Sequence, residues 1–219
     1  MNVYFLLTGL INEYYVSQII NTYKYINNKI ISTWKDSDPK LLELLIQNNF
    51  ILVLNDKPEY ECSANYILTH VKNGCIKAQS LNCDYIIQIR TDLIPNDIEL
   101  FYNYCTQQIN HNKFCALGWY SHDCGYILNH FLFGNIEKML KMFHEPKVEN
   151  DLRFSEKFFQ ETYFNMENVT FNMAKIEFKF IIKELYDNNI SFKWLKYPNH
   201  PELVKHFLDE KSCIHKILY

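Results

Sequence analysis

The sequence predicts an α/β fold with a mixed, mostly parallel central sheet that is flanked by helices. Two observations lead to this prediction. Short apolar segments rich in β-branched and aromatic residues alternate with segments of helical periodicity, and each apolar segment ends in polar residues. Strands and helices that alternate in this way favour parallel pairing with right-handed crossovers. The 219 residues suit a single domain and leave ample length for a core.

The first half of the chain contains four expected strands, each followed by an expected helix. The strands cover residues 3–7, 29–34, 50–54 and 85–89. The helices cover residues 11–23, 39–48, 63–80 and 95–108, with Pro95 at the start of the last one. The segment 85–89 is apolar on both faces apart from Gln88, which is typical of a buried central strand.

The second half of the chain has a different pattern. Residues 114–120 and 125–134 read as strands joined by a polar turn, and a strand is expected at 191–195. Helices are expected at 135–143, 154–164 and 172–186. A polar tail follows, and its histidines, His200, His206 and His215, lack ligand spacing, so we expect them at the surface.

Polar residues follow the first four strands, and the carboxyl ends of parallel strands meet at one edge of a sheet, where ligands bind in open α/β folds. A turn that contains glycine also brings backbone N–H groups and a helix N-terminus towards an anion. On the helix at 63–80, Lys72 can reach a diphosphate if that helix passes beside the site. The candidate ligand-binding residues at the strand ends are Thr8, Gly9, Thr33, Trp34, Asp56, Arg90 and Asp92.

Each of these residues also has a purely structural interpretation. Arg90 and Asp92 can form an ordinary surface ion pair, which contributes little to stability. Trp34 can belong to the core, and lysines such as Lys72 are commonly solvated.

Composition argues against several classes of partner. A net charge of −3 and a pI near 6.2 give no field that would attract nucleic acid.

Seven cysteines without CxxC spacing indicate reduced thiols in a reducing compartment. The apolar run at the N-terminus lacks a basic flank and is too short for a signal peptide or a transmembrane span. We therefore expect a cytoplasmic protein that reaches a membrane only by peripheral recruitment.

Five segments of the chain form a recognisable set. They are the strand leading into Thr8-Gly9, then Ser32-Thr33-Trp34, Ile89-Arg90-Thr91-Asp92-Leu93, Phe131-Leu132-Phe133-Gly134 and Ser155-Glu156-Lys157-Phe158. Taken together, these segments resemble the WavE-type glycosyltransferases of lipopolysaccharide synthesis, and the resemblance covers residues 1 to about 165. Similar small glycosyltransferases occur in large DNA viruses, which the AT-rich composition would suit, and the protein would then act in the host cytoplasm.

The resemblance implies a GT-A fold, in which a DxD motif at a strand end holds Mn²⁺ or Mg²⁺ against the diphosphate of a nucleotide sugar. Asp92 matches the final carboxylate of that motif and is the candidate metal ligand. Arg90 stands where the first Asp would be. An arginine there can contact phosphate oxygens bidentately, which would weaken the dependence on metal.

The implied activity is transfer of a hexose or deoxyhexose from a nucleotide diphosphate to a glycan or glycolipid acceptor in polysaccharide biosynthesis. Residues 1–110 would bind the nucleotide sugar, residues 111–170 would serve acceptor and catalysis, and residues 171–219 would form a C-terminal appendage. Inversion at the sugar carbon requires a carboxylate base. The candidates are Glu156, which falls in a segment that resembles the family, then Asp123, with Glu161 as a further acidic residue nearby. Glu156 can instead be an acid favoured at a helix N-terminus, and Asp123 a turn residue.

Two alternatives remain open. A sugar nucleotidyltransferase shares nucleotide binding on a similar sheet, but that class usually has a Gly-rich loop with Arg and Lys after the first strand, and residues 8–12 contain no such loop. A non-catalytic module that binds a sugar nucleotide or a glycan would be consistent with Arg90 in place of a metal-binding Asp.

Overall fold

A computed structural model describes residues 1–111, 114–120, 125–144, 178–180 and 182–197. The main sheet has seven strands in the order β3-β2-β1-β4-β7-β6-β8. Strands β1, β2, β3 and β4 are mutually parallel, whereas β7 runs antiparallel to both β4 and β6, and β8 pairs parallel with β6. The bounds are β1 Val3–Thr8, β2 Lys29–Trp34, β3 Ile51–Asn55, β4 Tyr85–Arg90, β6 Phe114–Tyr120, β7 Gly125–Asn135 and β8 Phe178–Phe180.

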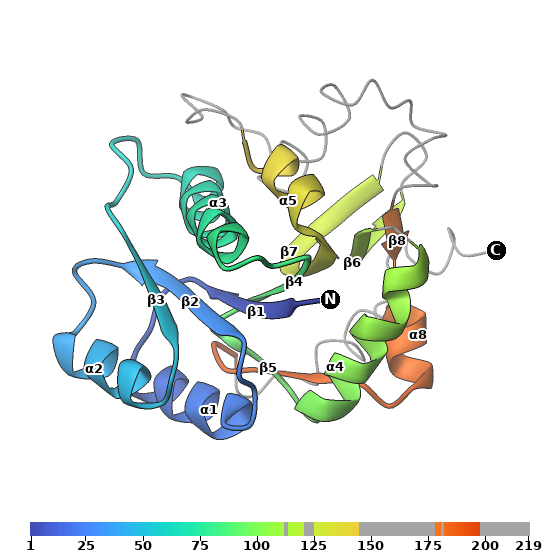
Figure 1. The fold of residues 1–219 in the computed structure, drawn as a ribbon, viewed down its shortest axis with the longest axis horizontal. Helices are drawn as coiled ribbons and strands as arrows, with labels where there is room; N and C mark the ends of the chain where they lie inside the picture. Colours follow the sequence, from blue (N-terminus) through green and yellow to red (C-terminus); the bar gives the residue numbers. More distant parts are fainter. Residues whose placement is uncertain (112–113, 121–124, 145–177, 181, 198–219) are drawn as a thin grey trace.

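Helices cover both faces of this sheet (Figure 1). On one face lie α1 (Glu13–Tyr23), α2 (Pro39–Gln47) and α4 (Ile98–Gln107), which continues into the 3₁₀ turn η1 (Gln108–His111). On the other face lie α3 (Ser63–Ser80) and α5 (Ile136–Met142). Helix α8 (Ile182–Asp187) packs near α4, and its Leu185 belongs to the core of the first face. A hydrophobic core lies on each face of the sheet, and successive side chains of β1 point into opposite cores. Phe5 and Leu7 pack with α1, whereas Leu6 packs with α3.

Helix α3 lies very close to β1 because a glycine faces the sheet. A Cβ atom on Gly74 would lie 2.4 Å from Cδ1 of Leu6, a side chain that is fully buried. Any larger residue would therefore have to displace Leu6 from a packed core. This close approach fixes the distance between α3 and the carboxyl ends of the central strands.

Short polar side chains set the helix ends. Asn12, Asp38 and Asp97 cap α1, α2 and α4 by accepting hydrogen bonds from backbone N–H groups of the first turn. Asparagines with positive φ follow helices α2, α3 and α8, and asparagine is the non-glycine residue that tolerates this conformation best. They are Asn49, Asn82 and Asn189.

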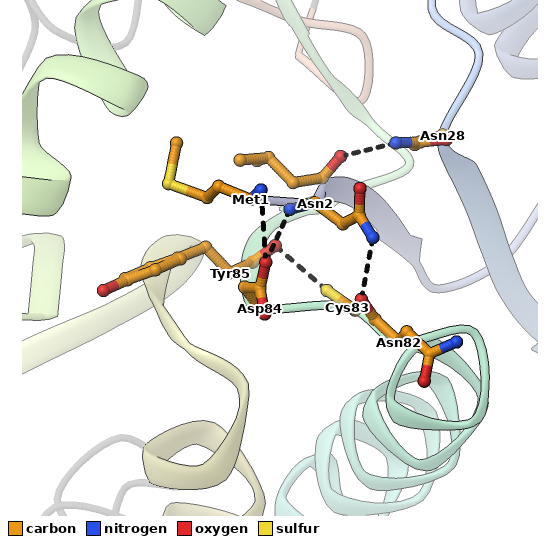
Figure 2. A network of polar contacts seen from close by, with 8 residues as sticks. Met1, Asn2, Asn28, Asn82, Cys83, Asp84 and Tyr85 are labelled. Atoms are coloured by element: carbon orange, nitrogen blue, oxygen red, sulfur yellow. Dashed lines mark hydrogen bonds and ion pairs between the residues drawn. The ribbon is translucent and has the colours of Figure 1, made fainter.

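A network of polar contacts ties together the amino ends of β1, β2 and β4 (Figure 2). Oδ2 of Asp84 accepts a hydrogen bond of 2.6 Å from the backbone N–H of Asn2, and the Asn2 amide donates to the carbonyl of Asn82 at 3.1 Å. Asn28 donates to the carbonyl of Val3 at 3.2 Å. These contacts fix the register of the three strands at the end opposite to the site described below.

A second, small sheet pairs β5 (Leu93–Pro95) antiparallel with β9 (Phe192–Trp194). The expected helix start at Pro95 is therefore wrong. Pro95 belongs to β5, and α4 begins only after Asp97 caps its first turn. The local pattern at 93–95 does not reveal the strand, because the partner strand β9 lies about a hundred residues further along the chain.

The expected helix at 172–186 is also wrong in part. Among the described residues of this range, 178–180 form β8, which pairs with the edge of β6, and the helix α8 covers residues 182–187. Aromatic residues fit a pleated edge well, so this pairing overrides the helical periodicity. The expected helix at 154–164 and the tail histidines His200, His206 and His215 lie outside the described residues. No helix within the described part of the chain is both long and apolar enough to cross a membrane.

Candidate ligand-binding site

A pocket of about 340 Å³ lies at the carboxyl ends of β1, β2 and β4, beside the first half of α3. This volume falls in the range of small-molecule sites. One side of the pocket is aromatic, the other side carries two cations, and the turn after β1 lies between them. The lining residues are Thr8, Gly9, Leu10, Trp34, Tyr66, Ile67, His70, Gln88, Arg90 and Lys196.

Arg90 and Asp92 form a bidentate ion pair at the end of β4. Nε of Arg90 donates to Oδ1 of Asp92 at 2.9 Å, and Nη2 donates to Oδ2 at 2.7 Å. The Asp92 side chain is 8% exposed, whereas that of Arg90 is 29% exposed and lines the pocket. A guanidinium group has five N–H donors, so this pairing leaves three of them for a ligand in the pocket.

Asp92 also holds strand β9 in place. Its Oδ2 accepts a hydrogen bond of 3.2 Å from Nε1 of Trp194, and its backbone carbonyl accepts one of 2.8 Å from Leu195. Lys196 follows directly and lines the same pocket as Arg90. Asp92 therefore orients Arg90 and also anchors the segment that carries Lys196.

His130 of β7 packs beside this cluster without adding charge to it. Its ring lies edge to face with that of Trp194, with the ring centroids 5.2 Å apart. Burial and the nearby Arg90 cation lower the pKa of His130 to about 4. The imidazole is therefore neutral near pH 7.

These contacts do not fit a divalent metal at Asp92, the predicted metal ligand. Both of its carboxylate oxygens already accept hydrogen bonds from Arg90 or Trp194. Mn²⁺ and Mg²⁺ prefer several oxygen ligands, and within the described residues no three His, Cys, Asp or Glu side chains cluster closely enough to hold an ion. A metal would therefore have to compete with the guanidinium of Arg90 for both oxygens of Asp92.

The turn after β1 is tightly constrained. Gly9 has a φ of 128°, and a Cβ atom there would lie 3.0 Å from Oγ1 of Thr91. The Thr91 hydroxyl in turn donates to the carbonyl of Leu10 at 2.6 Å. The turn therefore requires glycine, and it lets the backbone itself form part of the pocket wall.

Gln88 lies beneath the floor of the pocket. Its Nε2 donates to the Thr8 hydroxyl at 2.9 Å, while its Oε1 is buried and has no hydrogen-bond partner among the described residues. A buried acceptor without a partner is costly to the fold. Such a group is commonly retained where a ligand uses it.

The aromatic side of the pocket is built from β2 and α3. The ring centroids of Trp34 and His70 lie 4.0 Å apart, and those of Trp34 and Tyr66 lie 5.2 Å apart. Tyr66 and His70 are four residues apart on α3 and so share one face of the helix. The Tyr66 hydroxyl donates to the Glu61 carboxylate, which fixes the orientation of that ring.

A buried asparagine determines the tautomer of His70. The Asn55 amide nitrogen donates to the carbonyl of Thr33 at 2.9 Å, while its Oδ1 accepts a hydrogen bond of 2.7 Å from Asn73, so the orientation of the amide is settled. The same nitrogen lies 3.2 Å from Nδ1 of His70. Because an amide nitrogen cannot accept a hydrogen bond, Nδ1 carries no proton and the ring proton resides on Nε2.

Burial lowers the pKa of His70 from its ordinary value of 6.5 to about 4. The residue as a whole is 4% exposed, and its ring is therefore neutral at physiological pH. Together with the Asn55 contact, this gives His70 a fixed N–H donor at the wall of the pocket.

The structure brings together some of the residues predicted from the sequence and separates others. Thr8, Gly9, Trp34 and Arg90 line the pocket, and Asp92 lies directly behind Arg90. Three other candidates do not line it, because each has a different partner. Thr33 pairs with Ser37 at 3.3 Å, Asp56 with Lys35 at 2.6 Å, and Lys72 donates to the carbonyl of His144 at 3.3 Å. Glu156, Asp123 and Glu161 lie outside the described residues.

Six of the lining residues were not predicted from the sequence, namely Leu10, Tyr66, Ile67, His70, Gln88 and Lys196. Gln88 carried a signal, since it is the polar exception in a strand that is otherwise apolar on both faces. The i, i+4 spacing of Tyr66 and His70 was a weaker signal. Lys196 carried none, because its position depends on the pairing of β9 with β5.

Comparison with known proteins supports the fold. No family model matches the chain, and no curated protein matches its sequence. Among solved structures, a cytidylyltransferase from Leptospira borgpetersenii serovar Hardjo-bovis is similar with a TM-score of 0.50 and 12% sequence identity, over 82% of this chain and 75% of that chain. The 4-diphosphocytidyl-2C-methyl-D-erythritolsynthase from Anaerococcus prevotii has a TM-score of 0.49 and 10% identity, over 82% of this chain and 85% of that chain.

At this level of identity the likeness concerns the fold alone. It confirms the expected GT-A-like class, a mixed and mostly parallel sheet flanked by helices in one domain.

The state of His70 can be tested on the protein without a ligand. Nitrogen-15 NMR of the imidazole should show the proton on Nε2 and a neutral ring down to about pH 5, because burial disfavours the charged form. A proton on Nδ1, or a titration near 6.5, would contradict the arrangement around Asn55.

Proposed function

We propose that the pocket binds a nucleotide-diphosphate sugar and that the protein transfers the sugar to a glycan or glycolipid acceptor. The observation that carries this proposal is the division of one pocket into an aromatic side, with Trp34 and His70, and a cationic side, with Arg90 and Lys196. A nucleotide has the same division between a planar base and a charged diphosphate. The position of the pocket at the carboxyl ends of parallel strands also fits a nucleotide site.

The two cations would supply the main chemical contribution. Breaking the bond between the sugar and the diphosphate develops negative charge on the leaving phosphate, and preorganised donors stabilise that charge. Arg90 is held in place by Asp92 before a ligand arrives, so it does not need to reorganise during the reaction. We infer that Asp92 acts through Arg90, as a positioning residue.

The fold class commonly suggests Mn²⁺ or Mg²⁺, but the three hydrogen bonds that the Asp92 carboxylate already accepts from Arg90 and Trp194 support a different arrangement. We propose that Arg90 and Lys196 neutralise the diphosphate and that no metal binds at Asp92. Bidentate contact between a guanidinium and phosphate oxygens is a strong interaction in a partly buried site.

The catalytic base remains a proposal from the sequence. Glu156 is our first candidate and Asp123 the second, with transfer by inversion. The WavE-type resemblance, and with it a role in polysaccharide biosynthesis, a cytoplasmic location and peripheral recruitment to a membrane, belongs to the same proposal. The division of the chain into a donor half (1–110), an acceptor half (111–170) and a C-terminal appendage (171–219) is also part of this proposal.

A sugar nucleotidyltransferase is the second candidate, because the similar structure from Leptospira is a cytidylyltransferase. Such an enzyme must stabilise a leaving pyrophosphate, which needs cationic groups around the triphosphate. The turn from Gly9 to Asn12 contains no Lys or Arg, and the described cations of the pocket follow β4 and β9 instead. This distribution favours a diphosphate ligand. A non-catalytic sugar-nucleotide or glycan-binding module on the same fold remains the third candidate.

Binding gives the first test. At least one of UDP, GDP and dTDP should stabilise the protein, by about 2.7 kcal/mol at a hundred times its dissociation constant. EDTA should not abolish this effect, because Arg90 and Lys196 rather than a metal would hold the diphosphate. Thermal unfolding and titration calorimetry, with EDTA or with Mn²⁺, provide the measurement.

Lys196→Ala should weaken binding of the diphosphate, whereas Lys72→Ala, which alters a lysine outside the pocket, is the matched control and should not. If no nucleoside diphosphate binds at millimolar concentration, the proposed function is wrong. If binding requires Mn²⁺, the proposal for Arg90 is wrong.

Turnover separates the candidate functions. With a nucleotide sugar, wild-type protein should slowly release nucleoside diphosphate, and Glu156→Gln should slow this release or the transfer by about 10²–10⁴ while donor affinity stays unchanged. Asp123→Asn is the matched variant, and a large loss in that variant alone would move the base to Asp123. Pyrophosphate release from a nucleoside triphosphate and a sugar phosphate would instead identify a nucleotidyltransferase. Binding with neither activity would favour the non-catalytic module.

A further inference from the structure

We propose that His70 recognises the nucleobase of the donor, by donating a hydrogen bond from Nε2–H to an acceptor atom on the base. This inference rests on the proposed function and deepens it, because it assigns a residue that selects the nucleotide. His70 lines the pocket, and no partner for its Nε2 occurs among the described residues.

The contacts of Asn55 make His70 a donor and exclude the role of acceptor. Asn55 is 3% exposed, and its amide is held by Thr33 on one side and by Asn73 on the other. The amide nitrogen faces Nδ1 of His70, so the only ring proton points away from Asn55, on Nε2. The buried Asn55 amide, held by the Thr33 carbonyl and by the Asn73 side chain, therefore stands behind one N–H group, an arrangement typical of sites in which a supporting shell orients a binding group.

The surroundings of His70 favour a base over a phosphate. The ring is neutral, and it packs against the ring of Trp34, which in turn contacts that of Tyr66. The cations of the pocket belong to the ends of β4 and β9, whereas His70 packs on the end of β2. Strand β1 lies between β2 and β4, which separates the two sides by two strand spacings, about 10 Å. A flat base beside Trp34 would leave its diphosphate pointing towards Arg90.

A neutral donor fixed in one tautomer gives a definite selection rule. It accepts a base that presents a carbonyl oxygen or an unprotonated ring nitrogen at that point, and it rejects a base that presents an amino group there. A mismatch would leave a buried donor opposite another donor, which is costly because neither group can return to water.

Two substitutions separate the hydrogen bond from packing against Trp34. His70→Phe keeps an aromatic ring and removes the N–H donor, whereas His70→Gln keeps an N–H donor and removes the ring. We expect His70→Phe to weaken binding of the preferred nucleoside diphosphate about tenfold, and His70→Gln to retain more of the affinity. Inorganic pyrophosphate, which has no base, should bind all three proteins equally.

Calorimetry with UDP, GDP, dTDP, CDP and pyrophosphate tests this directly, and NMR of the wild-type protein supplies a readout that needs no variant. Saturation with the preferred nucleotide should shift the Nε2–H signal of His70, and pyrophosphate should leave it unchanged.

Equal nucleotide affinity in wild type and His70→Phe, or an unchanged signal, would overturn the role of His70 while the proposed function stands. Equal weakening of pyrophosphate would assign His70 to the phosphates and also overturn the inference. Failure of all nucleotides to bind wild-type protein would overturn the proposed function, and the inference with it.

Discussion

The ion pair between Arg90 and Asp92 is the interaction on which the rest of the site depends. It lies where the central strand β4 ends, and Asp92 uses the same carboxylate and its own carbonyl to hold Trp194 and Leu195. A strand from the C-terminal part of the chain is thereby joined to the N-terminal half of the fold. Without this contact, Arg90 would lose its orientation and Lys196 would lose its support. Burying the Asp92 carboxylate costs desolvation free energy, and the three side-chain hydrogen bonds that it accepts offset this cost.

The two sides of the pocket use burial in opposite ways. On the aromatic side, burial keeps His70 neutral, so that a histidine can act as a fixed donor beside Trp34. On the cationic side, the ion pair with Asp92 holds the Arg90 guanidinium at the pocket, and burial together with that cation lowers the pKa of His130 and keeps it neutral. Among the described lining residues, the charged side chains, Arg90 and Lys196, therefore lie on the side that would face a diphosphate, and a single pocket can distinguish the two ends of a nucleotide.

The sequence predicted the N-terminal half of the fold well because the signals there are local. The pattern of α3 from Ser63 to Ser80 and the end of β4 at Arg90 follow from periodicity and from polar residues placed after apolar runs. The ion pair partners and Trp34 could be selected for the same reason. Pro95, β8 and Lys196 could not be placed correctly, since their structure depends on strands that pair across long sequence separations. Nor could the role of His70 be inferred, because Asn55 and Asn73 come from other elements.

The central claim is that Asp92 positions Arg90 to bind a diphosphate, and a double-mutant cycle tests it most directly. Affinity for a nucleoside diphosphate, measured by calorimetry in EDTA, would be compared with affinity for the matching nucleoside in wild type, Arg90→Ala, Asp92→Asn and the double variant. The account predicts that each single variant weakens the diphosphate and spares the nucleoside, and that the double variant is little worse than Arg90→Ala alone. Additive losses, or equal losses for nucleoside and diphosphate, would contradict it.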